Sequence, residues 1–283
     1  MLLLAAVAQA QIPRMQAVPL PYDEISFRRD GKELTRLHYS ARMDRPFLYP
    51  VYSAKGDEMT RIGHPHDPHG HRHHYSLWFA ATPVSGQNFW GDGEGRIRAK
   101  RVVKIDDGAT KATVVLESAW GALLDEQRTI SVIDLGGDWM IEMGMTLKAL
   151  NGPVVFDAKG FGPVGVRMAK SIGVNDGGGK IVNSSGLVNG KAIFRQPARW
   201  VDYSGPVPSG LAGITLFDHP SNVQHPQAMH VRDDGWMGAV MTEKGAVTIP
   251  RGETITLRYG FLVHTGALNK DAVEAVWKAF AER

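Results

Sequence analysis

The chain has 283 residues, of which 43% are hydrophobic and 22% are charged; this is typical of a folded globular protein and excludes a disordered or fibrous chain. Its 32 basic and 29 acidic residues are interspersed and give a formal net charge of +3, so we expect no nucleic acid partner, because no basic block could follow a phosphate backbone. The absence of cysteine excludes disulfides, thiolate metal sites and cysteine nucleophiles.

The first ten residues have the pattern of a signal peptide. An apolar run over residues 1–7 is followed by Ala8-Gln9-Ala10, a small-x-small cleavage signature. No basic residue precedes the apolar run, so a coincidental apolar leader is the alternative. We expect cleavage after Ala10, a periplasmic or secreted protein, and no transmembrane segment in the mature chain, since no later segment is apolar for long enough.

Residues 24–265 have the rhythm of an antiparallel all-β protein, with short β-branched and aromatic runs separated by Gly, Asp and Asn. We predict three hairpins, which pair residues 25–29 with 33–38, 97–105 with 111–117, and 128–133 with 139–147. The first turns at Asp30-Gly31, which readily adopts the positive φ angles of a tight hairpin. Further strands are expected at residues 212–217, 238–242 and 254–264, and no helical period is visible in this stretch.

The C-terminal tail has the pattern of a short helix. Asn269 can cap it, and Val273, Val276, Trp277 and Phe280 then share one face. No internal repeat and no flexible linker divides the chain. We therefore predict one antiparallel β-sandwich domain over residues 11–283, with a short C-terminal helix docked on it.

A histidine-rich loop is the first candidate site. Six of the eleven histidines fall within residues 63–75, namely His64, His66, His69, His71, His73 and His74. Pro and Gly indicate a loop that leads into a strand over residues 75–80, and on an extended segment His71 and His73 would face one side and His74 the other. The imidazoles could contact a substrate, or His71 and His73 could bind a divalent transition metal such as Zn or Cu. The alternative is a solvated loop whose rings pack locally, and substrate contact is favoured over metal because the sequence assigns no further ligand.

A second candidate site lies in residues 217–232. Asp218 and His219 end an apolar strand and enter a proline-bracketed loop that contains Asn222, while His230 and Arg232 share one face of the next strand. A carboxylate, imidazoles and a guanidinium could act as acid and base on a hydroxylated or anionic substrate. The alternative is a structural network in which Asp218 caps the turn and Arg232 pairs with a surface acid.

A third group, residues 157–167, contains Lys159, Arg167 and three glycines that bring the backbone close to a neighbour. No helix follows, so it is not a phosphate-binding loop. Aromatic side chains suit stacking on sugar rings, although most Trp side chains in a sandwich belong to the core. The candidates for stacking are Trp78, Trp90, Trp200 and Tyr203.

Together these motifs resemble the PmoA-like family, a domain of unknown function whose name suggests methane oxygenase. The resemblance rests on residues 45–50, 63–79, 89–90, 183–186, 200–205, 217–222, 230–232 and 259–264. It implies a galactose-mutarotase-like supersandwich and a setting among exported carbohydrate-processing proteins. The chain departs from the family pattern at Tyr75, where members usually have Arg, and at Lys159-Gly160-Phe161, where they tend to have Lys-Glu-Gly.

We therefore expect an exported carbohydrate-active protein, with a sugar or glycan as its ligand. His/Asp acid-base chemistry of this kind is compatible with a carbohydrate isomerase or epimerase, a hydrolase or a lyase; the alternatives are a non-catalytic carbohydrate-binding module and a metal-binding histidine loop. The expected catalytic residues are His71, His73, His74, Asp218, His230 and Arg232. The expected substrate-binding residues are Trp78, Trp90, Lys159, Arg167, Asp202, His219 and Asn222.

Overall fold

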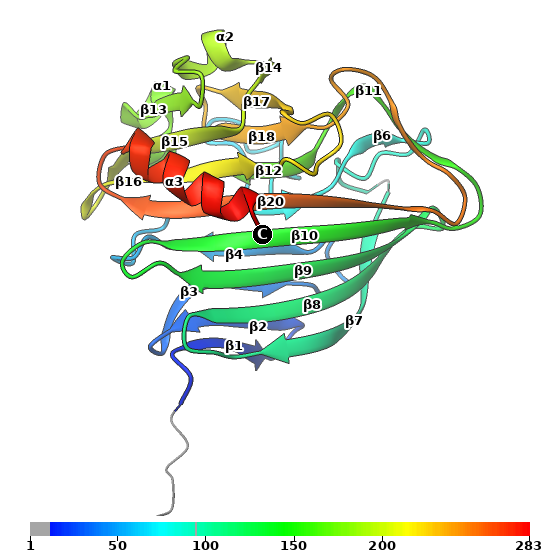
Figure 1. Ribbon diagram of the computed structural model, residues 1–283, viewed down its shortest axis with the longest axis horizontal. Coiled ribbons are helices and arrows are strands. Elements are labelled where there is room, and N and C mark those ends of the chain that lie inside the picture. Colours follow the sequence, from blue (N-terminus) through cyan, green and yellow to red (C-terminus); the bar gives the residue numbers. More distant parts are fainter. Residues whose placement is uncertain (1–11, 94) are drawn as a thin grey trace, which may run out of the picture.

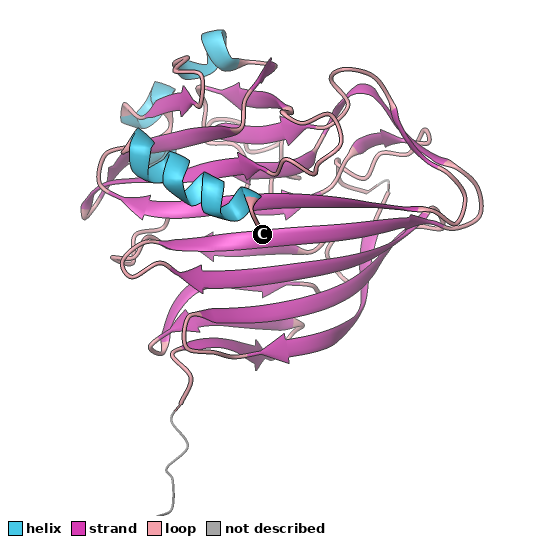
Figure 2. Cartoon of the chain, viewed as in Figure 1, coloured by secondary structure: helices cyan, strands magenta, loops and turns pink. Residues whose placement is uncertain are grey.

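A computed structural model describes residues 12–93 and 95–283. The predicted signal peptide, residues 1–10, lies outside the described residues. Regular structure in the described part is mostly β-strand, with a few helices on the outside (Figures 1 and 2). All strand pairs are antiparallel.

The described strands form three sheets. The first has the order β1 (Met15–Leu20), β2 (Glu24–Arg29), β3 (Lys32–His38), β4 (Phe47–Val51), β5 (Leu77–Phe79), β12 (Pro163–Arg167), β18 (Trp236–Val240), β17 (Ala228–Arg232) and β14 (Gln196–Pro197). The second has the order β13 (Lys180–Asn183), β15 (Trp200–Val207), β16 (Gly210–Asp218), β20 (Thr254–Thr265), β10 (Trp139–Ala149), β9 (Leu124–Asp134), β8 (Lys111–Trp120) and β7 (Ile97–Asp106). The third is β19 (Val247–Ile249), β11 (Val154–Phe161) and β6 (Thr82–Val84).

The two large sheets pack face to face, and β5 shows which way its side chains point. The Phe79 ring lies 5.6 Å from the Trp120 ring and 5.3 Å from the Arg128 guanidinium, both on the second sheet. Since successive side chains of a strand alternate, Trp78 points to the opposite face of the first sheet. The predicted antiparallel β-sandwich is therefore confirmed, and β5 presents one face to its core and the other to the candidate site.

The three predicted hairpins are confirmed as β2–β3, β7–β8 and β9–β10. Asp30 and Gly31 have φ angles of 50° and 78°, which fit the tight turn between β2 and β3. The predicted strand over residues 75–80 is shorter than expected, because only Leu77–Phe79 pair with neighbouring strands.

The C-terminal helix α3 (Lys270–Ala281) is also confirmed. The Asn269 side chain accepts a hydrogen bond from the Ala272 amide, as a capping residue does. Val273 and Phe280 are buried against Phe217 and Trp200, so the helix covers part of the second sheet (Figure 1).

Three short helices were not expected: η1 (Lys170–Ile172), α1 (Val174–Gly177) and α2 (Asn189–Ile193). Each is too short to show a helical period in the sequence. None of the described helices is long and apolar enough to cross a membrane.

Candidate functional site

The floor of the candidate site is built from four neighbouring strands, β5, β12, β18 and β17. Cross-strand partners share a face, and Gly165 of β12 pairs with Trp78 on one side and Gly238 on the other. A Cβ at Gly165 would lie 2.3 Å from the Trp236 ring and 3.1 Å from the Trp78 ring. The glycine therefore allows two indole rings to lie directly on the sheet, on the face turned away from the sandwich core.

Two further side chains of this face come from β17. His230 pairs with Gly238, and Arg232 pairs with Trp236. The expectation that His230 and Arg232 share one face is confirmed, and Arg232 Nε donates a hydrogen bond to His230 Nε2 at 3.4 Å. This bond makes Nε2 of the His230 ring the acceptor and leaves the proton on Nδ1.

The roof of the site is the histidine-rich loop. His71 has a φ of 56°, and the His74 amide donates to the His71 carbonyl at 3.0 Å, so this segment is a turn. The prediction that His71 and His73 share a strand face opposite His74 is therefore wrong. The turn instead directs all three imidazoles into one pocket.

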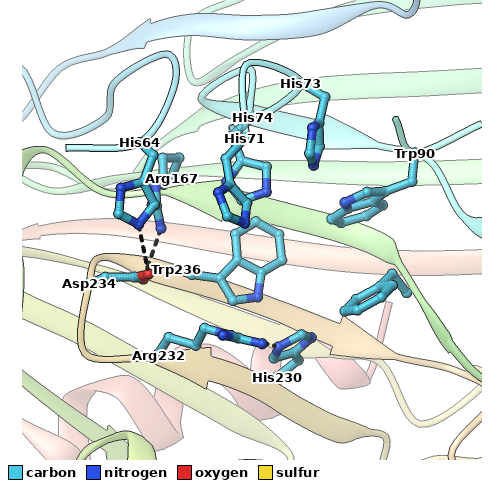
Figure 3. A pocket seen from close by; sticks show the side chains of 11 residues that line it. His64, His71, His73, His74, Trp90, Arg167, His230, Arg232, Asp234 and Trp236 are labelled. Carbon is cyan, nitrogen blue, oxygen red and sulfur yellow. Dashed lines mark hydrogen bonds and ion pairs between the residues drawn. The ribbon is translucent and has the colours of Figure 1, made fainter. Parts of the chain in front are cut away.

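Roof and floor enclose a cavity of about 390 Å³, which we call the histidine pocket (Figure 3). The His74 ring stacks on Trp236 at 5.0 Å and lies 4.6 Å from the His73 ring. The His230 ring meets the Trp236 ring edge-on at 5.9 Å. The residues that line the pocket are His64, His71, His73, His74, Trp90, Phe161, Arg167, His230, Arg232, Asp234 and Trp236.

One carboxylate, Asp234, connects the roof to the floor. It accepts hydrogen bonds from Arg167 Nη1 at 2.9 Å and from His64 Nε2 at 3.1 Å (Figure 3). Burial alone would raise the pKa of Asp234, but Arg167 and His64 outweigh it and hold the pKa below its usual range. His64 Nδ1 accepts from the His66 amide, so both ring nitrogens of His64 are engaged and this ring holds the loop in place.

The other imidazoles are kept neutral by their surroundings. Burial, reinforced by nearby arginines, lowers the pKa of His230 to about 4. Burial also lowers the pKa of His73 to about 4 and lowers the pKa of His71 and His74. At neutral pH these rings can donate one hydrogen bond and accept another, but they carry no charge.

Several polar atoms at the pocket are buried without a hydrogen-bond partner in the part of the chain that the structure describes. They include Arg167 Nη2, Trp236 Nε1 and His74 Nδ1. Leaving such a group unsatisfied costs about 1–3 kcal/mol.

Asp218, Asn222 and His219 lie elsewhere. Asp218 is fully buried, and its carboxylate accepts hydrogen bonds from Asn222 Nδ2 at 2.8 Å and the Gln227 amide at 2.8 Å, with His225 Nδ1 at 2.7 Å. His219 packs edge-on against Phe280 of α3, 5.0 Å away. None of the three expected site residues lines the histidine pocket, so the structure does not bring Asp218 together with His230 and Arg232.

Two other expected binding residues are also outside the pocket lining. Asp202 is buried within the second sheet and hydrogen-bonds Ser204, Thr215 and His264. Lys159 is exposed on β11. Of the expected stacking residues, Trp90 lines the pocket and Trp78 lies beneath it, 5.2 Å from His74 and 5.3 Å from Trp236, whereas Trp200 and Tyr203 belong to the second sheet.

Four lining residues were not among the expected site residues: His64, Phe161, Asp234 and Trp236. The last two could have been found from the sequence. Asp234-Gly235 is a turn signal directly after the strand that carries His230 and Arg232, so Trp236 lies opposite Arg232 in the resulting hairpin.

The predicted metal pair, His71 and His73, lies in the same pocket with ring centroids 5.8 Å apart. Among residues 12–93 and 95–283, no three His, Asp or Glu side chains are arranged to hold a metal ion. A metal at this pair stays a prediction.

Residues 24–278 match the model of a family described as a family of unknown function, DUF6807. The chain belongs to this family. The expected PmoA-like membership is wrong, because the family model that matches the chain is DUF6807. No curated protein matches the sequence.

Several solved structures align with the chain. A heparan sulfate lyase mutant from Pedobacter heparinus is 12% identical with a TM-score of 0.47, over 93% of this chain and 38% of that one. A heparinase III is 11% identical with a TM-score of 0.46, over 91% of this chain and 37% of that one. A galactose mutarotase related enzyme from Lactobacillus acidophilus is 8% identical with a TM-score of 0.33, over 90% and 96% of the two chains. The chain thus spans less than two fifths of the length of the first two of these proteins.

Proposed function

We propose that the protein is carbohydrate-active and that the histidine pocket binds and converts a sugar-type ligand. The observation that carries this proposal is one cavity lined by five imidazoles, two guanidinium groups and three aromatic side chains. Sugar hydroxyl groups accept and donate hydrogen bonds in many directions and could bond to these imidazoles and to Arg232. The cavity of about 390 Å³ is in the range of small-molecule sites.

The aromatic side chains of the pocket support the same ligand class. Trp90, Phe161 and Trp236 all line it, and the indole of Trp236 forms its floor. A sugar ring has an apolar face of C–H groups as well as polar edges. Its apolar face would pack on Phe161, the exposed aromatic side chain of the lining, while its hydroxyls reach the surrounding imidazoles and Arg232.

The imidazoles on opposite sides of Trp236 would carry the chemistry. His73 and His74 lie on the roof and His230 on the floor, so a ring bound between them would be within reach of proton transfer from both faces. Arg232, beside His230, would orient the ligand or stabilise an oxyanion. Asp234 takes the place expected for Asp218 as the carboxylate of the site, but its ion pair with Arg167 makes it a positioning group. Isomerisation or epimerisation, glycosidic hydrolysis and elimination are all compatible with this arrangement.

A second candidate function is carbohydrate binding without turnover. It is favoured by the low pKa values of His73 and His230, about 4 in both cases, because such imidazoles are weak bases at neutral pH. The same hydrogen bonds would then hold a glycan without transferring protons.

We also propose that the protein is exported to the periplasm or beyond, on the basis of the leader over residues 1–10. N-terminal sequencing of protein from the producing cells tests this directly. A mature chain that begins at Gln11 supports export, and an intact leader on cytoplasmic protein contradicts it.

The function is tested by titrating the full chain with a panel of neutral and acidic mono- and disaccharides. Tryptophan fluorescence reports binding, since Trp90 and Trp236 line the pocket, and NMR of the sugar reports product. We expect His74→Gln and His230→Gln to weaken binding at least tenfold, about 1.4 kcal/mol, while the control His219→Gln binds as the wild type does.

Product that forms only with intact His74 and His230 would establish the enzyme. Tight binding with no product from any sugar would establish the binding module. Binding that is unchanged in both pocket variants would contradict the proposed site.

A further inference from the structure

The charges of the histidine pocket do not balance. Arg167 is paired with Asp234, and burial lowers the pKa of His71, His73, His74 and His230, which keeps these four rings neutral. Arg232 makes no ion pair within residues 12–93 and 95–283. The pocket therefore presents one unmatched guanidinium to its ligand.

Arg232 is held in a defined position although it is exposed. Its Nε donates to His230 Nε2, and its guanidinium carbon lies 6.0 Å from the centroid of the Phe194 ring. In Figure 3 the guanidinium lies alongside His230, below Trp236. With Nε engaged by His230, the terminal nitrogens are left for an anion, and a guanidinium fork fits the oxygen pair of a carboxylate or sulfate.

A second hollow begins where the pocket ends. It has a volume of about 510 Å³ and shares Arg232 and Asp234 with the histidine pocket; its other lining residues are Asn175, Gly190, Lys191, Phe194, Val231 and Asp233. We call it the Phe194 groove. Phe194 is 40% exposed and meets the His230 ring edge-on at 5.0 Å, so it is an accessible aromatic surface directly beside the pocket.

The charged groups of the Phe194 groove do not cancel the charge of Arg232. Lys191 is exposed on α2. Asp233 accepts a hydrogen bond from the neutral Gly190 amide at 2.7 Å and keeps its charge, which Lys191 offsets, whereas Asp234 is paired with Arg167. Arg232 thus lies between the histidine pocket and the Phe194 groove and is the cation that a glycan spanning both would contact.

We infer that the ligand is an acidic glycan of at least two sugar units, whose anionic group is bound by Arg232 and whose neighbouring unit lies on Phe194. This inference rests on the proposed function and specifies its ligand. A uronate carboxylate and a sugar sulfate share the chemistry that Arg232 would recognise. Stacking of the next sugar unit on Phe194 would add affinity without changing the unit in the pocket.

The test is calorimetry of the full chain with matched probes. These are disaccharides that contain glucuronate, galacturonate or mannuronate, a sulfated disaccharide, the neutral counterpart of each, and the monosaccharide uronates. We expect at least one acidic disaccharide to bind tenfold or more tighter than its neutral counterpart. The uronate and sulfate arms show which anion is preferred.

Two variants separate the two parts of the inference. Arg232→Gln should abolish the preference for the acidic disaccharide, whereas the matched control Arg251→Gln, an exposed arginine in the turn before β20, should keep it. Phe194→Ala should weaken disaccharide binding about tenfold and leave the monosaccharide uronate unchanged. Thermal unfolding of each variant checks that the fold is retained.

The inference is overturned if neutral and acidic disaccharides bind equally, or if Arg232→Gln weakens both to the same degree. In either case sugar binding that depends on His230 would still stand, so the proposed function would survive. If no sugar of either kind binds, both the inference and the proposed function fall.

Discussion

The histidine pocket and the loop around Asp218 have similar residue types but opposite hydrogen-bonding states. The carboxylate of Asp218 is fully buried and bonded on all sides, to Asn222, His225 and the Gln227 amide. We call these four residues the Asp218 network. At the histidine pocket, by contrast, buried polar atoms of Arg167, Trp236 and His74 have no partner among the described residues.

This difference distinguishes a structural hydrogen-bond network from a candidate ligand site, which the residue types alone could not do. In the Asp218 network the hydrogen bonds join protein groups and hold a loop in place. The same loop anchors α3, since Trp277 Nε1 donates to the Asp218 carbonyl at 3.1 Å. Polar atoms without a partner among the described residues are unfavourable, and such atoms occur at functional sites as well as where water is bound. We therefore propose that the Asp218 network stabilises the fold and that the histidine pocket binds the ligand, and the following predictions test that proposal.

The largest effect is expected from Asp218→Ala. Removing a fully buried carboxylate would leave its three hydrogen-bond partners unsatisfied and lower the free energy of unfolding by about 3 kcal/mol. Urea unfolding measures the loss. The affinity of the folded variant for sugar should equal that of the wild type, and a stable variant that no longer binds would show that Asp218 belongs to the site after all.

A smaller loss of stability is expected from Asp234→Asn, because Asp234 both pairs with Arg167 and lines the histidine pocket. The Arg167 side chain is 1% exposed and would lose its ionised partner, but Asp234 is 24% exposed, so water would compensate in part. We expect the free energy of unfolding to fall by about 1–2 kcal/mol and ligand affinity to fall with it. Denaturant titration and calorimetry on the same preparation measure both, and loss of stability without loss of affinity would remove Asp234 from the site.

The stability of the protein should also depend on pH through its buried histidines. The pKa of His73 and of His230 is about 4 in the folded protein, against about 6.5 in an unfolded chain. Above pH 6.5 these two imidazoles are neutral in both the folded protein and the unfolded chain. Below pH 6.5 they bind protons in the unfolded chain but stay neutral in the folded protein. The free energy of unfolding should therefore fall between about pH 6.5 and pH 4.

The matched variants for this titration are His230→Gln and, as control, His69→Gln in the exposed part of the loop. The first should flatten the fall in stability over this range, and the second should leave it unchanged. Equal slopes in the wild type and in His230→Gln would mean that His230 is not shielded from solvent.

The smallest effect concerns metal. Two imidazoles alone hold zinc or copper weakly, and bound imidazoles must be unprotonated, so any metal at His71 and His73 should be lost on dialysis and as the pH is lowered. We expect less than about a tenth of an equivalent in untagged, dialysed protein, and activity that is insensitive to chelator. A full equivalent of metal that disappears in His71→Ala and His73→Ala would make this a metal site.

The sequence predicted the elements whose signals are local. The Asp30-Gly31 hairpin and the Asn269-capped helix both follow from a few adjacent residues. The loop histidines were also identified as candidate site residues, because their concentration is visible in one segment, and four of them line the pocket. The directions of these side chains were not predicted, since the positive φ of His71 places a turn where the sequence indicated a strand.

What sequence could not supply is the order of strands across the sheet. Residues from β5, β12, β18 and β17 meet on one face only because these strands, far apart along the chain, are neighbours. That order brings Trp236 beneath His74 and leaves Asp218 outside. From the sequence, the histidine loop and residues 217–232 were therefore expected to form one site. Only His230 and Arg232 of the second segment line the pocket with the histidine loop.

The most direct test of this account is the crystal structure of the protein with the tightest-binding sugar of the panel. We predict a sugar ring in the histidine pocket, against Phe161, with its oxygens within hydrogen-bond distance of His73, His230 and Arg232. A sugar bound at the Asp218 loop, or anywhere that leaves the histidine pocket empty, would contradict the central claim.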